Sequence, residues 1–230
     1  MTSDRARPAW RLCVLFGAGV VGFVVWFGGV IPTRNCGGPL SPGVSPLLAF
    51  QLARTAADIE AVFGQAGDSC RDAMVAAMDR ANVVDLLGFI LTYGAFLACF
   101  FLALLRTGAG GAVRVGFATV GAALAFDVLE TATQLYISGA LPGGTASLAL
   151  LTIGSRGKFL ALAGVGWCAG AAMIGRGRLV GRIAGVTCFI GGLLVLPGLV
   201  YAPARAGLSA GNALVWVVML LYAAAAGLRR

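Results

Sequence analysis

The 230-residue sequence is 59% hydrophobic and only 11% charged, with a mean hydropathy of +0.92. Soluble domains carry about 25% charged residues, so this composition excludes an ordinary soluble protein and predicts an all-α, polytopic integral membrane protein. The formal charge of +8 does not indicate a nucleic-acid partner, because no basic patch with interleaved aromatic residues lies outside the apolar runs. The absence of histidine removes the commonest catalytic base, the usual haem ligands and most zinc sites.

Six apolar runs are long enough to cross a bilayer, which takes roughly 20 residues. We expect them to form a single membrane domain over residues 1–230, in contact with lipid. The fourth run is difficult to bound, because Leu148 to Ile174 is too long for a minimal crossing and contains Arg156 and Lys158. Either a shallow segment precedes a span that begins near Ser155, or one long tilted helix carries both cations. The expected spans are residues 12–31, 83–105, 113–137, 155–174, 179–201 and 208–228.

Residues 32–82 form the only long polar segment, which we expect to lie outside the membrane on the extracytoplasmic side. The segment opens with a turn-rich stretch from Cys36 to Gly43. Apolar residues near helical spacing predict two short amphipathic helices, one over residues 47–63 and one over residues 72–79. We expect these helices to rest on the bilayer surface or to cap the bundle; the alternative is a mobile lid over a site.

The distribution of arginine predicts the orientation. Ten of the 17 cationic residues, but only one of the nine acidic residues, fall at the N-terminus, in the loops after the second and fourth spans, and at the C-terminus. Cationic loops stay on the cytoplasmic side, so we expect a cell-membrane protein with both termini in the cytoplasm. The ten cations are Arg5, Arg7, Arg11, Arg106, Arg114, Arg176, Arg178, Arg182, Arg229 and Arg230.

The third apolar run carries two acidic residues, Asp127 and Glu130, that require an explanation. Their spacing of three residues places them on one helix face, and Gln134 extends this polar stripe by one turn. At about 1.5 Å per residue, Asp127 and Glu130 lie roughly 21 and 26 Å from the cytoplasmic end of their helix, and Lys158 lies roughly 24 Å from the end of its own. This matching depth makes Lys158 the expected partner of Asp127 or Glu130.

Three further residues are candidates for the same cluster. Asp85, at roughly 30 Å from the cytoplasmic end of the second span, and Arg156 are expected near the cluster, with Tyr93 on the same span as Asp85. One lysine cannot neutralise two acids, so a second cation, a protonated carboxyl group, water or a bound ion must complete the cluster.

Several functions fit a buried cluster of this kind. It could only pin two helices together, or it could bind or transport a small molecule or an ion. The alternative is a metal-dependent membrane enzyme that acts on lipid or lipid-linked substrates, with Mg²⁺ held by Asp85, Asp127 and Glu130. No metal-binding motif supports this enzyme and a nearby lysine would repel the metal, so we predict no metal site and favour a protein that is not an enzyme. The sequence identifies neither a catalytic residue nor a cofactor.

Cysteine positions and small residues add two structural predictions. Cys36 and Cys70 are the only cysteines in the polar segment and are expected to form a disulfide in an oxidising compartment. Two pairs of glycines, Gly166 with Gly170 and Gly181 with Gly185, have the small-xxx-small spacing that lets helix backbones approach closely. The other cysteines lie within the spans, where we expect them to pack as small apolar residues: Cys13, Cys99, Cys168 and Cys188.

Overall fold

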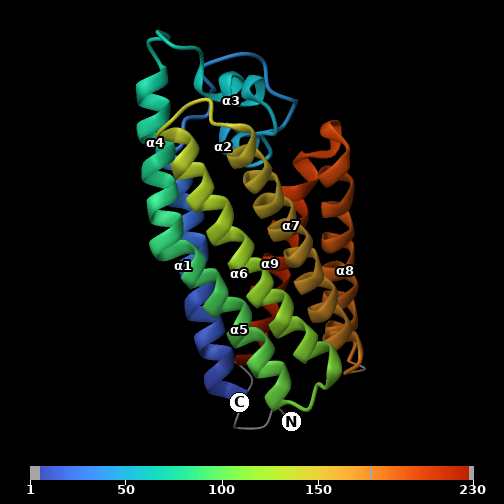
Figure 1. Ribbon diagram of the computed structural model, residues 1–230. Coiled ribbons are helices and arrows are strands. Elements are labelled where there is room, and N and C mark those ends of the chain that lie inside the picture. Colours follow the sequence, from blue (N-terminus) through green and yellow to red (C-terminus); the bar gives the residue numbers. More distant parts are fainter. Residues whose placement is uncertain (1–5, 177, 228–230) are drawn as a thin grey trace. The chain divides into compact units, whose positions relative to one another are not determined.

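The computed structural model describes residues 6–176 and 178–227, and the regular elements in these ranges are all helical (Figure 1). Arg5, Arg229 and Arg230, which contributed to the predicted orientation, and Leu228 at the end of the sixth predicted span lie outside these ranges. The elements are α1 (Arg7–Val30), α2 (Pro46–Gln51), α3 (Ala56–Phe63), α4 (Arg71–Val84), the π-helix η2 (Asp85–Phe89), α5 (Ile90–Arg106), α6 (Gly111–Ser138), α7 (Thr145–Ile174), α8 (Leu179–Val200), the 3₁₀ turn η3 (Ala202–Ala204) and α9 (Ala206–Gly227).

Among the described residues, six helical stretches are long and apolar enough to cross a membrane, and they follow the order of the predicted spans. The fourth is one unbroken helix from Thr145 to Ile174, so the prediction of one long helix holds and the prediction of a separate shallow segment is wrong. The six stretches are Arg7–Val30, Arg71–Arg106, Gly111–Ser138, Thr145–Ile174, Leu179–Val200 and Ala202–Gly227.

The helix predicted over residues 47–63 is two helices. α2 ends at Gln51, and α3 begins after Thr55, whose side chain accepts a hydrogen bond from the backbone N–H of Asp58. The Asp58 carboxylate accepts one in return from the backbone N–H of Thr55, which completes a capping box. The hydrophobic spacing was nearly helical throughout, but this cap signal at Thr55 starts a new helix.

Residues 72–79 are helical as predicted, but the prediction that they form a separate short helix is wrong. The chain is helical without interruption from Arg71 to Arg106, because α4 passes through η2 directly into α5. The second candidate span is therefore longer at its N-terminal end than the apolar run indicated, and the polar face of α4 is part of the same helix as Asp85.

Two groups of segments are each compact. The first unit comprises residues 6–21, 92–124, 159–176 and 178–227, and the second comprises residues 22–91 and 125–158. In the first unit, Trp10 of α1 makes edge-to-face contacts with Phe100 and Tyr222. The predicted glycine packing is present there: a Cβ atom on Gly170 would lie 2.7 Å from the carbonyl oxygen of Gly185, so α7 and α8 meet backbone to backbone.

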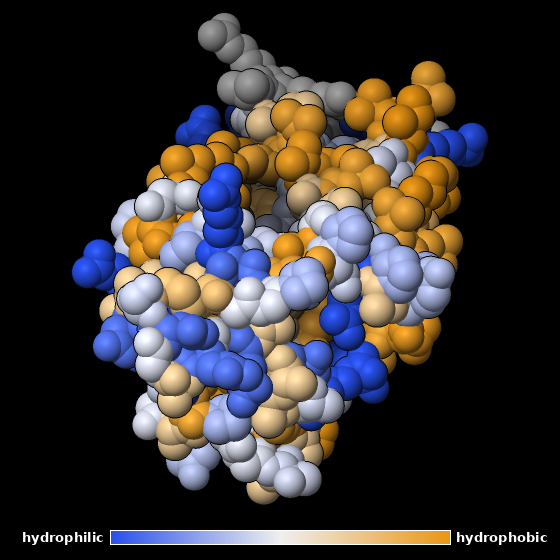
Figure 2. All heavy atoms as spheres, turned by 90° about the horizontal axis from the view of Figure 1, so that it is seen from above, coloured by the Kyte–Doolittle hydropathy of each residue, from blue (hydrophilic) through white to orange (hydrophobic). Residues whose placement is uncertain are grey.

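The second unit has a hydrophobic core at one end. The rings of Phe50 in α2 and Phe63 in α3 meet edge to face, with centroids 4.8 Å apart. This core joins the short helices to the ends of three longer ones through Met74 and Met78 of α4, Ile137 of α6 and Leu148 of α7. The short helices α2 and α3 are therefore packed as a cap on this unit, and Figure 2 shows hydrophilic side chains gathered on the face seen from above.

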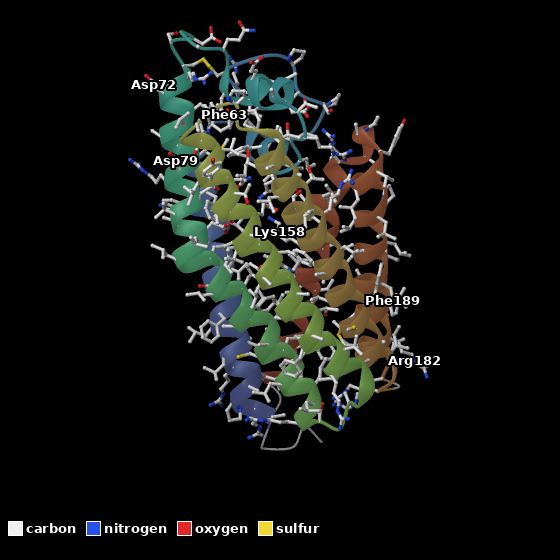
Figure 3. The ribbon with its side chains drawn as sticks, in the orientation of Figure 1. Phe63, Asp72, Asp79, Lys158, Arg182 and Phe189 are labelled. Atoms are coloured by element: carbon white, nitrogen blue, oxygen red, sulfur yellow. A yellow bond between two sulfur atoms is a disulfide. The ribbon has the colours of Figure 1, made fainter. Side chains whose placement is uncertain are left out.

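A disulfide joins Cys36 to Cys70, as predicted, with a Cα–Cα distance of 5.7 Å. Cys36 lies in the loop before α2, and Cys70 directly precedes α4. The backbone N–H of Cys36 also donates to the carbonyl oxygen of Val62, so this loop is attached to α3 as well. The disulfide closes the cap of the second unit onto the start of α4 (Figure 3).

Candidate functional site

Lys158 lies between two carboxylates of α6. Its Nζ is 2.6 Å from Oε1 of Glu130 and 3.0 Å from Oδ1 of Asp127. Lys158 is 6% exposed, Asp127 3% and Glu130 0%, so all three charged side chains are buried. Lys158 is the only lysine of the sequence, in which the remaining basic residues are arginines. The structure thus places Lys158 beside both of its candidate partners.

Two glycines of α7 bring these groups together. A Cβ atom on Gly154 would lie 2.8 Å from the backbone nitrogen of Glu130, and one on Gly157 would lie 2.5 Å from the ring of Phe126. Larger residues at either position would hold the two backbones apart. Because Gly154 contacts Glu130 and Gly157 contacts Phe126, α6 and α7 are antiparallel here, and this register brings Lys158 beside Asp127.

Asp85 joins the site from a different helix. Thr131 Oγ1 of α6 donates a hydrogen bond of 2.8 Å to Oδ2 of Asp85, which is half-buried. Asp85 is the first residue of η2, where the helix widens for five residues. Such π-helical turns are rare and occur frequently at functional sites, because they change the direction of the side chains that follow.

The same two helices are joined a second time nearer the cap. Ser138 Oγ donates a hydrogen bond of 2.5 Å to Oδ1 of Asp79. Sequence reasoning missed Asp79, Ser138 and Thr131 as members of a polar interface. A signal was present, since polar residues recur every three residues at Asp79, Asn82 and Asp85, and every three or four at Thr131, Gln134 and Ser138.

Three buried polar atoms in this region make no hydrogen bond to another atom of the described chain. They are Oε2 of Glu130, Nε2 of Gln134 and Nδ2 of Asn82, whose residues are at most 2% exposed. A buried polar group without a partner is costly, commonly by 1–3 kcal/mol, so native structures rarely contain three close together without a reason. Gln134 therefore belongs to the polar region, as its spacing from Glu130 predicted.

Tyr93 and Arg156 are the two remaining predicted residues. Tyr93 belongs to the first unit, where its ring stacks on Trp216 with centroids 5.4 Å apart. Arg156 is half-buried, and among the described residues it forms no ion pair. A second cation was one of several ways to balance the charge of the cluster, and the described residues show no ion pair that gives Arg156 this role.

The charge of the site is unbalanced as a result. The charged groups that act on Glu130 are Lys158, Asp127 and Asp85, so with Glu130 itself the site holds three carboxyl groups and one ammonium group. Within residues 6–176 and 178–227, no group of three or more His, Cys, Asp or Glu side chains is arranged to hold a metal ion.

No protein-family model matches this chain, and comparisons with curated proteins and with solved structures likewise find no match.

Proposed function

We propose that this chain is a multi-pass membrane protein that crosses the bilayer six times. The support comes from the six long apolar helices, which are also apolar on their outer faces. Each stretch exposes at least one large hydrophobic side chain, which water would disfavour and lipid would accept. Examples in chain order are Leu15, Leu87, Val115, Ile153, Ile183 and Leu221.

The orientation of the chain can be tested with two glycines. Gly110 and Gly144 are exposed and have open space around them, so a cysteine fits at either position. With the four free cysteines replaced, Gly144→Cys should react with an impermeant thiol reagent in intact cells, and Gly110→Cys should react only after lysis. Reaction of Gly110→Cys but not of Gly144→Cys in intact cells would reverse the proposed orientation.

We infer that the cluster of Asp85, Asp127, Glu130 and Lys158 is a buried proton-binding site of the kind that couples ion movement to transport. The observation that carries this inference is Glu130, which is fully buried and has one carboxylate oxygen on Lys158 and the other, Oε2, without a hydrogen bond in the described chain. Ionisable groups at membrane depth commonly act in proton relays or substrate pathways. A proton on Oε2 would reduce the excess negative charge.

A proton fits this position better than a metal ion does. Glu130 offers a single oxygen, whereas Mg²⁺ and Ca²⁺ take six or more oxygen ligands. The ammonium group of Lys158 also lies 2.6 Å from the other oxygen of the same carboxylate and would repel a metal ion. The metal-dependent enzyme considered from the sequence therefore gains no support from this geometry.

Helix pinning, the other use of such a cluster, has one observation in its favour: the ion pair joins α6 to α7. These helices already approach closely at Gly154 and Gly157, however, and glycine contacts by themselves hold helices together in membranes. A proton on Glu130 would remove one of the two charges that attract Lys158. Proton binding and the contact between α6 and α7 are thereby coupled, which a purely structural pair does not require.

The single lysine makes the proposal directly testable. In protein labelled with ¹³C-lysine, the Cε resonance of Lys158 reports the charge of its neighbours without overlap from other lysines. We expect this resonance to shift with pH in the wild-type protein and to lose that shift in Glu130→Gln. The matched control is Glu60→Gln, which changes the other glutamate, in α3, and should leave the titration unchanged.

A Lys158 resonance that stays fixed over the pH range in which the protein remains folded would contradict proton binding and leave helix pinning as the role of the cluster. The same conclusion would follow if Glu130→Gln titrated like the wild type.

A further inference from the structure

The interface between α4 and α6 has a regular register. Asp79 is hydrogen-bonded to Ser138, and Asp85 is hydrogen-bonded to Thr131. Asp85 follows Asp79 by six residues, whereas Thr131 precedes Ser138 by seven. The two helices are therefore antiparallel, and each step along one matches a step back along the other. Asn82, midway between Asp79 and Asp85, comes level with Gln134, which lies between Thr131 and Ser138.

The middle level of this interface differs from the levels on either side. Asp79 with Ser138 and Thr131 with Asp85 form direct hydrogen bonds, but Nδ2 of Asn82 and Nε2 of Gln134 donate to no atom of the described chain. Asn82 is 2% exposed and Gln134 1% exposed, so bulk solvent does not satisfy them. Two buried donors at the same level are what a bound water molecule, with its two acceptor sites, would bridge.

The third buried atom without a partner continues the same line. Glu130 precedes Gln134 by four residues, so their side chains share one face of α6 about one turn apart. Oε2 of Glu130 can accept a hydrogen bond, whereas the amide nitrogens of Gln134 and Asn82 can only donate. Donors and an acceptor thus follow one another from the middle level of the interface to the proposed proton site.

The polar line opens toward the cap of the second unit. Asp79 is half-buried, whereas Asn82, Gln134 and Glu130 are buried, so Asp79 is the end of the line that solvent reaches. In Figure 3, Asp79 lies between Lys158 and the end of α4 that bears the disulfide. Ser138, which bonds to Asp79, and Glu130 are eight residues apart, or roughly 12 Å along α6, which about four hydrogen-bonded water molecules can bridge.

We propose that the α4–α6 interface holds a chain of water molecules from Asp79, past Asn82 and Gln134, to Glu130, and that this chain carries protons to the buried cluster. This inference rests on the proposed proton-binding function and adds the route and the side of access. Asn82 and Gln134 orient the water molecules, and neither residue gains or loses a proton itself. The charged groups that face the route are Asp79, Asp85, Asp127 and Lys158.

The first measurement detects water at the route. In the wild-type protein, the side-chain amide groups of Asn82 and Gln134 should show magnetisation transfer from water in nuclear magnetic resonance spectra, although both residues are buried.

The second measurement is the rate at which the Lys158 resonance responds to a pH jump. Asn82→Leu and Gln134→Met remove the donors with little change of volume and should slow this response roughly tenfold, since an unmade hydrogen bond to a buried group costs on the order of one such factor. Gln65→Met, at an exposed loop position, is the control and should leave the rate unchanged.

The outcomes separate the route from the proposed function. Water contact together with slowed responses and an unchanged final titration supports the route. A titrating Lys158 with wild-type rates in both variants overturns the route and leaves the proton site intact. If Lys158 does not titrate at all, the proposed function fails, and so does the proton-carrying route. If Asn82 and Gln134 show no contact with water, the water chain is excluded whatever the titration shows.

Discussion

Two pairs of helices in this protein are held together in different ways. α8 and α9, in the first unit, pack at Gly191 and Gly211: a Cβ atom on Gly211 would lie 2.5 Å from the carbonyl oxygen of Gly191. In the second unit, α6 and α7 also approach at a glycine, Gly154, but in addition they bury the ion pairs of Lys158. The first pair shows that close backbone contact can join two helices of this chain through small residues.

The buried charges of the Lys158 cluster add a cost that the α8–α9 pair does not have. Removing charges from water costs several kcal/mol per ion, and an ion pair recovers this cost only with good geometry and further hydrogen bonds. Since glycine contacts are present in both helix pairs, helix association does not account for the added cost of the Lys158 cluster. This difference agrees with our proposal that the cluster binds a proton, and the following experiments test it.

The largest expected effect is that of Lys158→Ala. This variant leaves Asp127 and Glu130 buried without their cation, and removing one partner of a buried pair typically costs about 3–5 kcal/mol. Thermal unfolding in detergent should show a large loss of stability. Arg80→Ala removes an exposed cation of α4 and serves as the control, with an expected change within about 0.5 kcal/mol.

Double variants show which acid matters more to Lys158. Glu130→Gln with Lys158→Met, and Asp127→Asn with Lys158→Met, each replace a charged pair by neutral side chains and should recover part of the loss. If both doubles are as unstable as the sum of their single variants, the ion pairs do not couple α6 to α7. If a double variant recovers stability but not the cellular phenotype that Lys158→Ala causes, the cluster has a role beyond helix packing.

The second-largest effect is expected from loss of the disulfide, which links the loop before α2 to the start of α4 in the second unit. Cys36 and Cys70 are 34 residues apart, and the chain-entropy estimate for closing such a loop is about 3–4 kcal/mol. Cys36→Ser with Cys70→Ser should lower the thermal stability of the cap, measured by proteolysis of residues 32–70. Finding both thiols free by mass spectrometry, after blocking without reductant, would rule out the disulfide in the native protein.

The smallest effect is expected at the glycine contact of α8 and α9. Gly211→Ala forces the two backbones apart, and overpacking of this kind typically costs about 1–3 kcal/mol. Gly121→Ala in α6 is the matched control, because its Cβ atom would meet open space, and it should be neutral or slightly stabilising. Equal thermal unfolding of Gly211→Ala and Gly121→Ala would show that close glycine packing does not hold α8 and α9 together.

The sequence was informative wherever a property adds up along the chain. Hydropathy summed over a window located all six candidate spans, and counting residues at a fixed rise brought Lys158 to the depth of Asp127 and Glu130. The pairing of Cys36 with Cys70 followed from the lack of another cysteine in the polar segment. Helix starts and ends were predicted less accurately. The cap at Thr55 was missed, and α4 was predicted as a helix separate from the span that it begins.

By itself, then, the sequence determined the helical class, the order and approximate limits of the apolar helices, and the burial of one lysine with an excess of acids. Only the tertiary structure decided that Lys158 contacts both acids, that Thr131 bonds to Asp85, and that Nδ2 of Asn82 and Nε2 of Gln134 make no hydrogen bond within the described chain. The physical reason is that hydropathy and residue rise are properties of one helix, whereas these contacts depend on the rotation and register of two helices. That rotation is fixed by close approaches such as that of Gly154 to Glu130, which no single-helix pattern reveals.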